Sequence, residues 1–157
     1  MKIQLIVVGK TRQDFVLSGV SEFSKRIGHY LPFEIIVVPD IKNSKNMPVE
    51  QQKEWEAERL LKHFHPNDHV ILLDENGKEY SSVQFAAFLE KTTASAVKNT
   101  VFVIGGAYGF APSVYARAQE KIALSQMTFS HQLVRLIFVE QLYRALTILN
   151  NEPYHHE

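Results

Sequence analysis

Short apolar runs rich in β-branched residues alternate along the chain with longer segments whose apolar residues recur at helical spacing. The apolar runs predict strands at residues 3–8, 34–38, 69–73, 101–104 and 122–124. The longer segments predict helices at residues 14–29, 48–63, 83–90 and 131–150. Alternation of this kind favours an α/β fold with a mostly parallel sheet and helices on both of its faces.

The last predicted helix is apolar around more of its circumference than one core-facing stripe requires. Leu133, Ile137, Val139, Tyr143 and Leu149 contribute to this wide surface. Such a helix needs burial on two sides, either at the centre of a large core or against a second subunit. In a chain this short we expect the second subunit, and therefore a homodimer.

Residues 74–78 read Asp-Glu-Asn-Gly-Lys directly after the third predicted strand. The Asn76-Gly77 pair is typical of tight turns, because both residues adopt left-handed backbone conformations that other residues resist. The sequence therefore predicts a turn at this point.

The length of 157 residues and an apolar content of 45% fit one compact domain over residues 1–157. The chain has no cysteine, which excludes disulfides and thiolate metal sites and allows a cytoplasmic location. The opening apolar run is too short for a signal peptide or a membrane span, so we expect no membrane association.

Positive charge is concentrated near the start of the chain, although the 17 basic and 17 acidic residues balance overall. Lys10, Arg12, Lys42 and Lys45 fall in the segments after the first two predicted strands, where one sheet edge could present them to a phosphate backbone. The alternative is ordinary solvated loop cations. That alternative is favoured by the near-neutral pI of about 7.1, which is unusual for a free-standing nucleic-acid binder.

Open α/β sheets bind ligands outside the carboxyl ends of their strands, so residues 73–75, 104–109 and 124–129 are the candidate binding segments. The second segment, Ile-Gly-Gly-Ala-Tyr-Gly, is not a dinucleotide fingerprint and has no P-loop lysine. It predicts exposed backbone that can hold a flat ligand such as a base. The alternative is a tight turn that needs glycine for positive φ angles.

Histidines cluster at His63, His65 and His69, but Pro66 interrupts the segment and no acidic ligand completes a metal site. We therefore expect no bound metal. The tail after Pro153 offers further polar chemistry at Tyr154 and His155. It is either a frayed end or a lid over a ligand.

Several motifs together resemble one family. They are I-G-G-x-x-G at 104–109, L-S-x-M-T-F-S-H-Q-L-V-R at 124–135, E-Q-L-Y-R-A at 140–145 and P-Y-H at 153–155, preceded by the opening strand at 1–10. In this order and at this length they resemble the RlmH family, SPOUT-class methyltransferases of a pseudouridine in bacterial 23S ribosomal RNA. The resemblance implies an α/β trefoil-knot fold, a homodimer and action on the assembled ribosome.

The resemblance also implies site residues and a cofactor, S-adenosylmethionine as methyl donor to ring nitrogen 3 of the pseudouridine, with no metal. The implied cofactor-binding residues are Leu73, Gly105, Gly106, Leu124, Ser125, Gln126, Met127, Thr128 and Phe129. For catalysis it implies His155 as proton acceptor or relay, Tyr154 as its orienting partner, and Arg144 as a stabiliser of negative charge or a phosphate ligand. Arg144 also has Glu140 at i−4, so a plain ion pair is the alternative.

Two other functions fit the same residues. One is a methyltransferase of this fold class directed at transfer RNA or another ribosomal position. The other is a non-enzymatic ribosome-binding factor, against which the intact glycines Gly105 and Gly106 argue.

Overall fold

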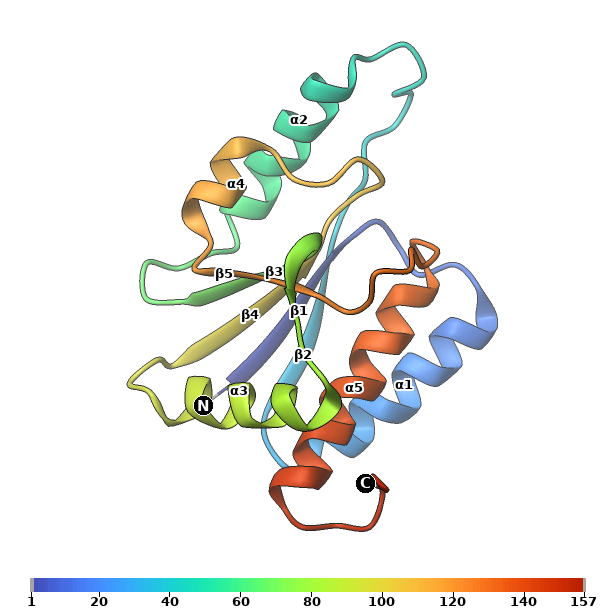
Figure 1. Cartoon of the computed structure of the whole chain (residues 1–157). Helices are drawn as coiled ribbons and strands as arrows, with labels where there is room; N and C mark the ends of the chain where they lie inside the picture. Colours follow the sequence, from blue (N-terminus) through green and yellow to red (C-terminus); the bar gives the residue numbers. More distant parts are fainter. Residues whose placement is uncertain (1, 157) are drawn as a thin grey trace.

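A computed structural model describes residues 2–156; Met1 and Glu157, which the expected domain range includes, lie outside the described residues. One parallel sheet has the strand order β2-β1-β4-β3-β5 (Figure 1). Its strands are β1 (Lys2–Val8), β2 (Phe33–Val38), β3 (His69–Glu79), β4 (Asn99–Ile104) and β5 (Glu120–Ala123). The predicted parallel sheet and the five predicted strands are therefore confirmed.

Helices cover both faces of this sheet. They are α1 (Asp14–Gly28), α2 (Val49–Leu61), α3 (Ser82–Ala94), α4 (Pro112–Arg117) and α5 (Leu133–Leu149). Figure 1 shows α1, α3 and α5 on one face and α2 with α4 on the other. The side chains of β4 alternate accordingly: Phe102 and Ile104 enter the core with α3 and α5, whereas Val101 and Val103 enter the core with α2 and α4.

Helix α5 packs between α1 and α3 on the sheet, which accounts for its wide apolar surface. Phe138 stacks against Phe102 of β4 with ring centroids 4.8 Å apart, and Val139 and Leu142 are fully buried. On the α1 side, a Cβ at Gly19 would lie 2.7 Å from Leu136 Cδ1, so this glycine lets the two helices approach closely. The chain itself thus buries α5 on more than one side. No helix within residues 2–156 has both the length and the apolarity to cross a bilayer.

The starts of α3 and α5 differ from the sequence prediction for local reasons, and α4 is absent from it. Helix α3 starts earlier than expected because Ser81 and Gln84 form a capping box. Helix α5 starts at Leu133, whose N–H donates to Ser130 Oγ over 3.0 Å. The six-residue α4 was not predicted, since a helix this short shows no apolar period, although Pro112 at its first position is a typical start.

The turn predicted at residues 74–78 is wrong. Strand β3 continues to Glu79, and the segment forms a bulge in which Leu73 and Lys78 both pair with Ile122 of β5. Neither Asn76 nor Gly77 has a positive φ. A Cβ at Gly77 would lie 2.6 Å from the backbone nitrogen of Ile122, so glycine is needed here for close approach of two strands.

Candidate functional site

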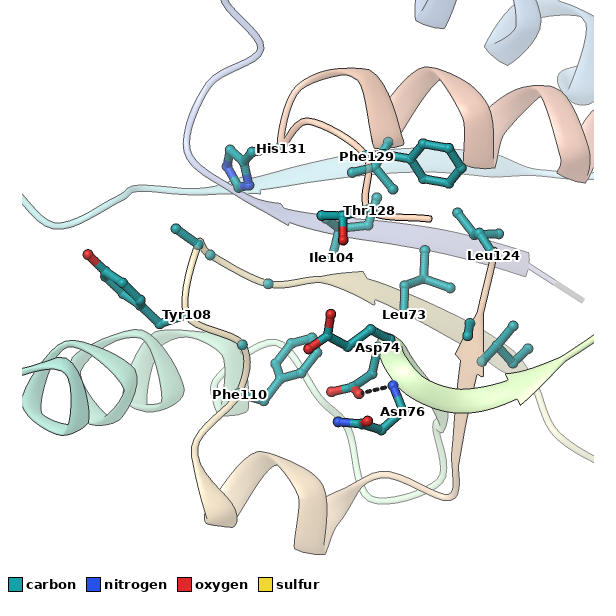
Figure 2. Close-up of a pocket in the computed structure, with 18 of the residues that line it drawn as sticks. Leu73, Asp74, Asn76, Ile104, Tyr108, Phe110, Leu124, Thr128, Phe129 and His131 are labelled. Carbon is teal, nitrogen blue, oxygen red and sulfur yellow. Dashed lines mark hydrogen bonds between the residues drawn. The ribbon is translucent and has the colours of Figure 1, made fainter. Parts of the chain in front are cut away.

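A cavity of about 630 Å³ lies at the carboxyl ends of β3, β4 and β5. Its walls come from the segments after these strands, completed by Lys53, Tyr115, His131 and Val134 (Figure 2). Parallel strands place their carboxyl ends at one edge of the sheet, which is why segments far apart in the sequence meet here. The volume is that of a typical small-molecule site.

All nine residues predicted to bind a cofactor line this one cavity. They are Leu73, Gly105, Gly106, Leu124, Ser125, Gln126, Met127, Thr128 and Phe129. Leu73 and Leu124 supply apolar surface, and Met127 is 77% exposed at the opening. The three segments that the sequence singled out thus form one site.

The glycines of the loop after β4 are required by packing within the protein. A Cβ at Gly105 would lie 2.8 Å from Phe110 Cε1, and a Cβ at Gly106 would lie 2.4 Å from Glu56 Oε2. Only Gly109, with φ of +85°, needs the left-handed region. The missing Cβ atoms at Gly105 and Gly106 thus leave room for Phe110 and Glu56, and the assignment of both glycines to the cofactor stays a prediction.

Glu56 of α2 fixes the glycine-containing loop after β4 by a hydrogen bond to its backbone. Its Oε1 accepts a hydrogen bond from the Gly106 N–H over 3.2 Å. Burial raises the pKa of the Glu56 carboxyl, the Gly106 N–H opposes that rise, and the nearby charge of Asp40 adds to it. Sequence reasoning missed Glu56, because it is one of several glutamates on a charged helix and nothing in the spacing marks it.

Asp74 presents a carboxylate of fixed orientation at the cavity. Its Oδ1 accepts the Asn76 N–H over 2.8 Å, and its Oδ2 accepts the hydroxyl of Tyr115. Burial and the hydrogen bond to Asp74 raise the pKa of Tyr115 to about 12, so this hydroxyl stays a donor at neutral pH. The carboxylate can attract a cation or accept hydrogen bonds from ligand hydroxyls. The sequence had marked residues 73–75 as a candidate binding segment, without giving Asp74 a role of its own.

Arg135 joins the start of α5 to the end of β1. Its guanidinium is buried and donates to Val8 O over 2.7 Å and to Gly9 O over 2.8 Å. A third bond reaches Thr11 Oγ1 over 2.9 Å. Burial and the Arg135 charge lower the pKa of His131, which lines the cavity. Arg135 therefore fixes the segment between β5 and α5 across the carboxyl edge of the sheet.

The three residues predicted for catalysis meet one another around Glu140. The carboxylate Oε1 of Glu140 accepts Tyr154 Oη over 2.9 Å and Arg144 Nη2 over 2.6 Å. Arg144 Nη1 donates to His155 Nδ1 over 3.0 Å, and the Tyr154 ring packs against Tyr143 with centroids 4.7 Å apart. Desolvation and the bond to Glu140 raise the pKa of Tyr154. The tail is thus folded onto α5 and is not a frayed end.

Within one chain the C-terminal cluster lies away from the cavity. Arg144, Tyr154 and His155 are not among the cavity-lining residues, whereas Val134, near the start of α5, is. Arg144 follows Val134 by about 15 Å along the helix axis at the α-helical rise. Figure 1 shows the C-terminus at the end of α5 opposite to its start. The predicted cofactor site and the predicted catalytic residues are therefore separate in the isolated chain.

The histidine cluster is dispersed in the fold. His69 Nε2 pairs with Glu120 Oε2 over 2.6 Å. Within residues 2–156, no three or more His, Cys, Asp or Glu side chains gather as a metal-binding group.

Solved structures with the same fold include a probable methyltransferase from Bordetella pertussis, with a TM-score of 0.57 at 10% identity, covering 92% of this chain and 93% of that one. A probable methylase family protein from Haemophilus influenzae gives a TM-score of 0.52 at 11% identity, covering 95% of this chain and 66% of that one. At these identities the likeness concerns the fold alone.

Sequence relatives are much closer. A protein of Parabacteroides distasonis named ribosomal RNA large subunit methyltransferase H is 57% identical over 157 residues, covering 100% of both chains. Proteins with the same name from Phocaeicola vulgatus and Bacteroides fragilis are 55% and 52% identical over the same full length. The family model described as "Predicted SPOUT methyltransferase" matches residues 1–155. This chain therefore belongs to the SPOUT methyltransferase family.

Proposed function

We propose that this protein transfers a methyl group from S-adenosylmethionine to ring nitrogen 3 of a pseudouridine in 23S ribosomal RNA, acting in the cytoplasm on the assembled ribosome. The observation that carries the proposal is the single cavity formed by all nine residues expected to hold the cofactor. The full-length relatives named as large-subunit ribosomal RNA methyltransferases support the RNA class.

The residues around the cavity fit such a cofactor. Leu73, Ile104 and Leu124 offer apolar surface for a flat base, and the backbone after each strand offers hydrogen-bonding groups to its edge. Asp74 offers a carboxylate to the ribose hydroxyls or to a positive charge, and Lys53 offers a cation to a carboxylate. When bound, the cofactor supplies an electrophilic methyl group that needs no metal.

The chain's own residues must orient the base and take up the imide proton of ring nitrogen 3. We assign the proton to His155, with Tyr154 as its orienting partner and Arg144 as the cation that stabilises negative charge on the base. Because Arg144 donates to His155 Nδ1, the Nδ1 lone pair is occupied in the described arrangement. Proton uptake at Nδ1 therefore requires Arg144 to turn toward the substrate.

The functional unit in this proposal is a homodimer of single-domain chains covering residues 1–157. The dimer is supported by the distance between the cavity and the Tyr154–His155 cluster of the same chain. The tail of a second copy can lie over the cavity that the chain's own tail does not reach. Partly exposed apolar side chains on α5, among them Ile137, are available to such a contact.

The proposal also includes the trefoil knot expected for this family. Residues 124–132 run from β5 at one edge of the sheet to β1, where Gln132 binds the backbone of Lys10 and Arg12. This crossing passes the ends of β3 and β4, as a threaded connection requires.

The test is to incubate the protein and labelled S-adenosylmethionine with ribosomes and with free ribosomal RNA from cells that lack this gene. Nuclease digestion and mass spectrometry then locate the label. Label on a pseudouridine of 23S RNA in ribosomes is the expected result. Cofactor binding by calorimetry without label on ribosomes would redirect the search to other RNAs, and absence of cofactor binding would overturn the proposal.

A further inference from the structure

Two lysine-bearing loops lie at the carboxyl edge of the sheet, the edge that also holds the cavity. The loop after β1 carries Lys10 and the loop after β2 carries Lys42 and Lys45, all with exposed side chains. Strands β1 and β2 form the half of the sheet next to the strands whose ends open into the cavity. The loops that carry the three lysines therefore leave the same edge of the sheet at which the cavity lies.

A glutamine fixes the first loop to the cavity wall. Gln132 Oε1 accepts the Arg12 N–H over 2.7 Å, and Gln132 Nε2 donates to Lys10 O over 3.2 Å. The residue before this glutamine, His131, lines the cavity. The backbone that carries Lys10 is thus held at a set position relative to the cavity.

A second glutamine fixes the other loop in the same manner. Gln52 Nε2 donates to Met47 O over 2.9 Å and to Ser44 O over 3.3 Å, and the next residue, Lys53, lines the cavity. Both loops are therefore ordered before any ligand arrives. Ordering on folding removes an entropic cost that a flexible loop would incur on binding.

The three lysines also differ from their neighbours in their ion pairing. The neighbouring cations are paired: Arg12 Nη2 lies 3.4 Å from Asp40 Oδ2, and Lys53 Nζ lies 3.7 Å from Glu50 Oε1. Among residues 2–156, no ion pair involves Lys10, Lys42 or Lys45. A protein with no net charge thus keeps three unpaired cations at the sheet edge that holds its cavity.

Tyr108 adds an aromatic surface at the rim. It is 55% exposed, and Figure 2 shows it on the side of the cavity away from Leu124. Exposed aromatic rings beside lysines are typical of surfaces that bind single-stranded RNA, where rings stack on bases and cations neutralise phosphates.

We infer that the two fixed loops form the substrate-binding surface for the ribosomal RNA strand, with phosphates at Lys10, Lys42 and Lys45 and a base stacked on Tyr108 at the cavity opening. This inference rests on the proposed function. It accounts for RNA binding by a protein of neutral pI, because the positive charge is local.

The experiment compares two triple variants on assembled ribosomes from cells that lack the gene. K10Q/K42Q/K45Q removes the loop cations. K62Q/K91Q/K98Q is the matched control, because these lysines are also exposed and lie in or next to the connections that lead into the amino ends of β3 and β4. The KM for ribosomes is measured over a potassium chloride series, together with kcat, the calorimetric Kd for S-adenosylmethionine and the hydroxyl-radical footprint on 23S RNA.

The loop variant should raise KM about tenfold or more at low salt and reduce the slope of log KM against log salt by about two to three. Its kcat and cofactor Kd should stay at the wild-type values, as should every parameter of the control. Tyr108→Ala should raise KM, and Tyr108→Phe should not.

Equal salt slopes for the loop variant and the control would overturn the inference while leaving the proposed function intact. An unchanged RNA footprint together with a reduced slope would assign the lysines to an acidic protein partner, which also overturns it. If wild-type protein methylates no ribosomal RNA at all, the proposed function itself fails.

Discussion

The carboxylate of Glu56 on α2 and the backbone of Gly106 after β4 are joined by a hydrogen bond of 3.2 Å between Oε1 and N. Oε2 occupies the space that a side chain at residue 106 would need. An acidic group thus sets the position of a loop that borders the cavity.

Replacing Glu56 by Gln should change the pH dependence of stability. Because burial raises the folded-state pKa of this carboxyl, its contribution to stability is fully present below the unfolded pKa and is lost as pH rises through the folded value. Glu56→Gln keeps an acceptor for Gly106 without that loss. The difference in the free energy of urea unfolding, variant minus wild type, should therefore increase as pH rises above the unfolded carboxyl pKa of about 4. A difference that stays constant above that pH would contradict the role assigned to burial.

Gly77→Ala should destabilise the protein by about 3 kcal/mol, the upper end of the usual cost of overpacking. The reason is that the added Cβ would lie 2.6 Å from the backbone of Ile122, which cannot move as freely as a side chain. Gly28→Ala is the control, because a Cβ there has no neighbour within 4 Å. It should be neutral or stabilising by up to about 1 kcal/mol. Thermal and urea unfolding of both variants check the difference, and equal stabilities would show that β5 moves away at no cost.

His155→Ala should lower kcat by about 10²-fold or more if this residue takes up the imide proton. The Kd for S-adenosylmethionine should not change, because His155 is assigned to the imide proton of the base and is not among the residues expected to hold the cofactor. His156→Ala, at the exposed neighbouring position, is the control and should keep wild-type kcat. Single-turnover methylation and calorimetry give the two quantities. Full activity of the His155 variant would remove its assigned role.

Mixing two inactive variants should restore activity if the tail serves the partner's cavity. Thr128→Trp fills the cavity but keeps the tail, and His155→Ala does the reverse. A mixed dimer then holds one complete site, so random exchange should recover about a quarter of wild-type activity. Methylation assays before and after subunit exchange measure this. No recovery, with exchange verified by mass spectrometry, would show that each tail serves its own chain.

Arg135→Met should lower the free energy of unfolding by about 2–4 kcal/mol, because it leaves the carbonyls of Val8 and Gly9 without their buried donor. Arg135→Lys keeps the charge but not the forked geometry of the guanidinium. Its stability should therefore lie between that of the Met variant and that of wild type. Urea unfolding gives both values. A Met variant as stable as wild type would mean that water replaces the guanidinium.

The strands and the edge at which the cavity forms were predictable from the sequence, because both follow from apolar periodicity. Ile71 and Phe102 lie in strands that their β-branched and aromatic neighbours already indicate. The cavity follows from the rule that parallel strands end at one edge, which brings the segments at Leu73, Gly105 and Leu124 together.

The contacts between elements were not predictable in the same way. Glu56 and Arg135 act on residues that are far away in the sequence, and each resembles an ordinary charged position on a helix. Gly77 sits in a pair typical of turns, but the packing of β5 against β3 gives it another purpose. The separation of His155 from the cavity depends on the direction of α5, which periodicity does not encode.

The bond from Arg135 to Gly9 spans 126 residues of sequence and sets an order of events during synthesis. The end of β1, with its carbonyl acceptors, leaves the ribosome first, and the Arg135 donor is made roughly 6–25 s later at translation rates of about 5–20 residues per second. Until then the carbonyl groups of Val8 and Gly9 in the nascent chain accept hydrogen bonds from water instead of from Arg135. The cavity, whose far wall is made between β5 and α5, is thus among the last parts of the molecule to form.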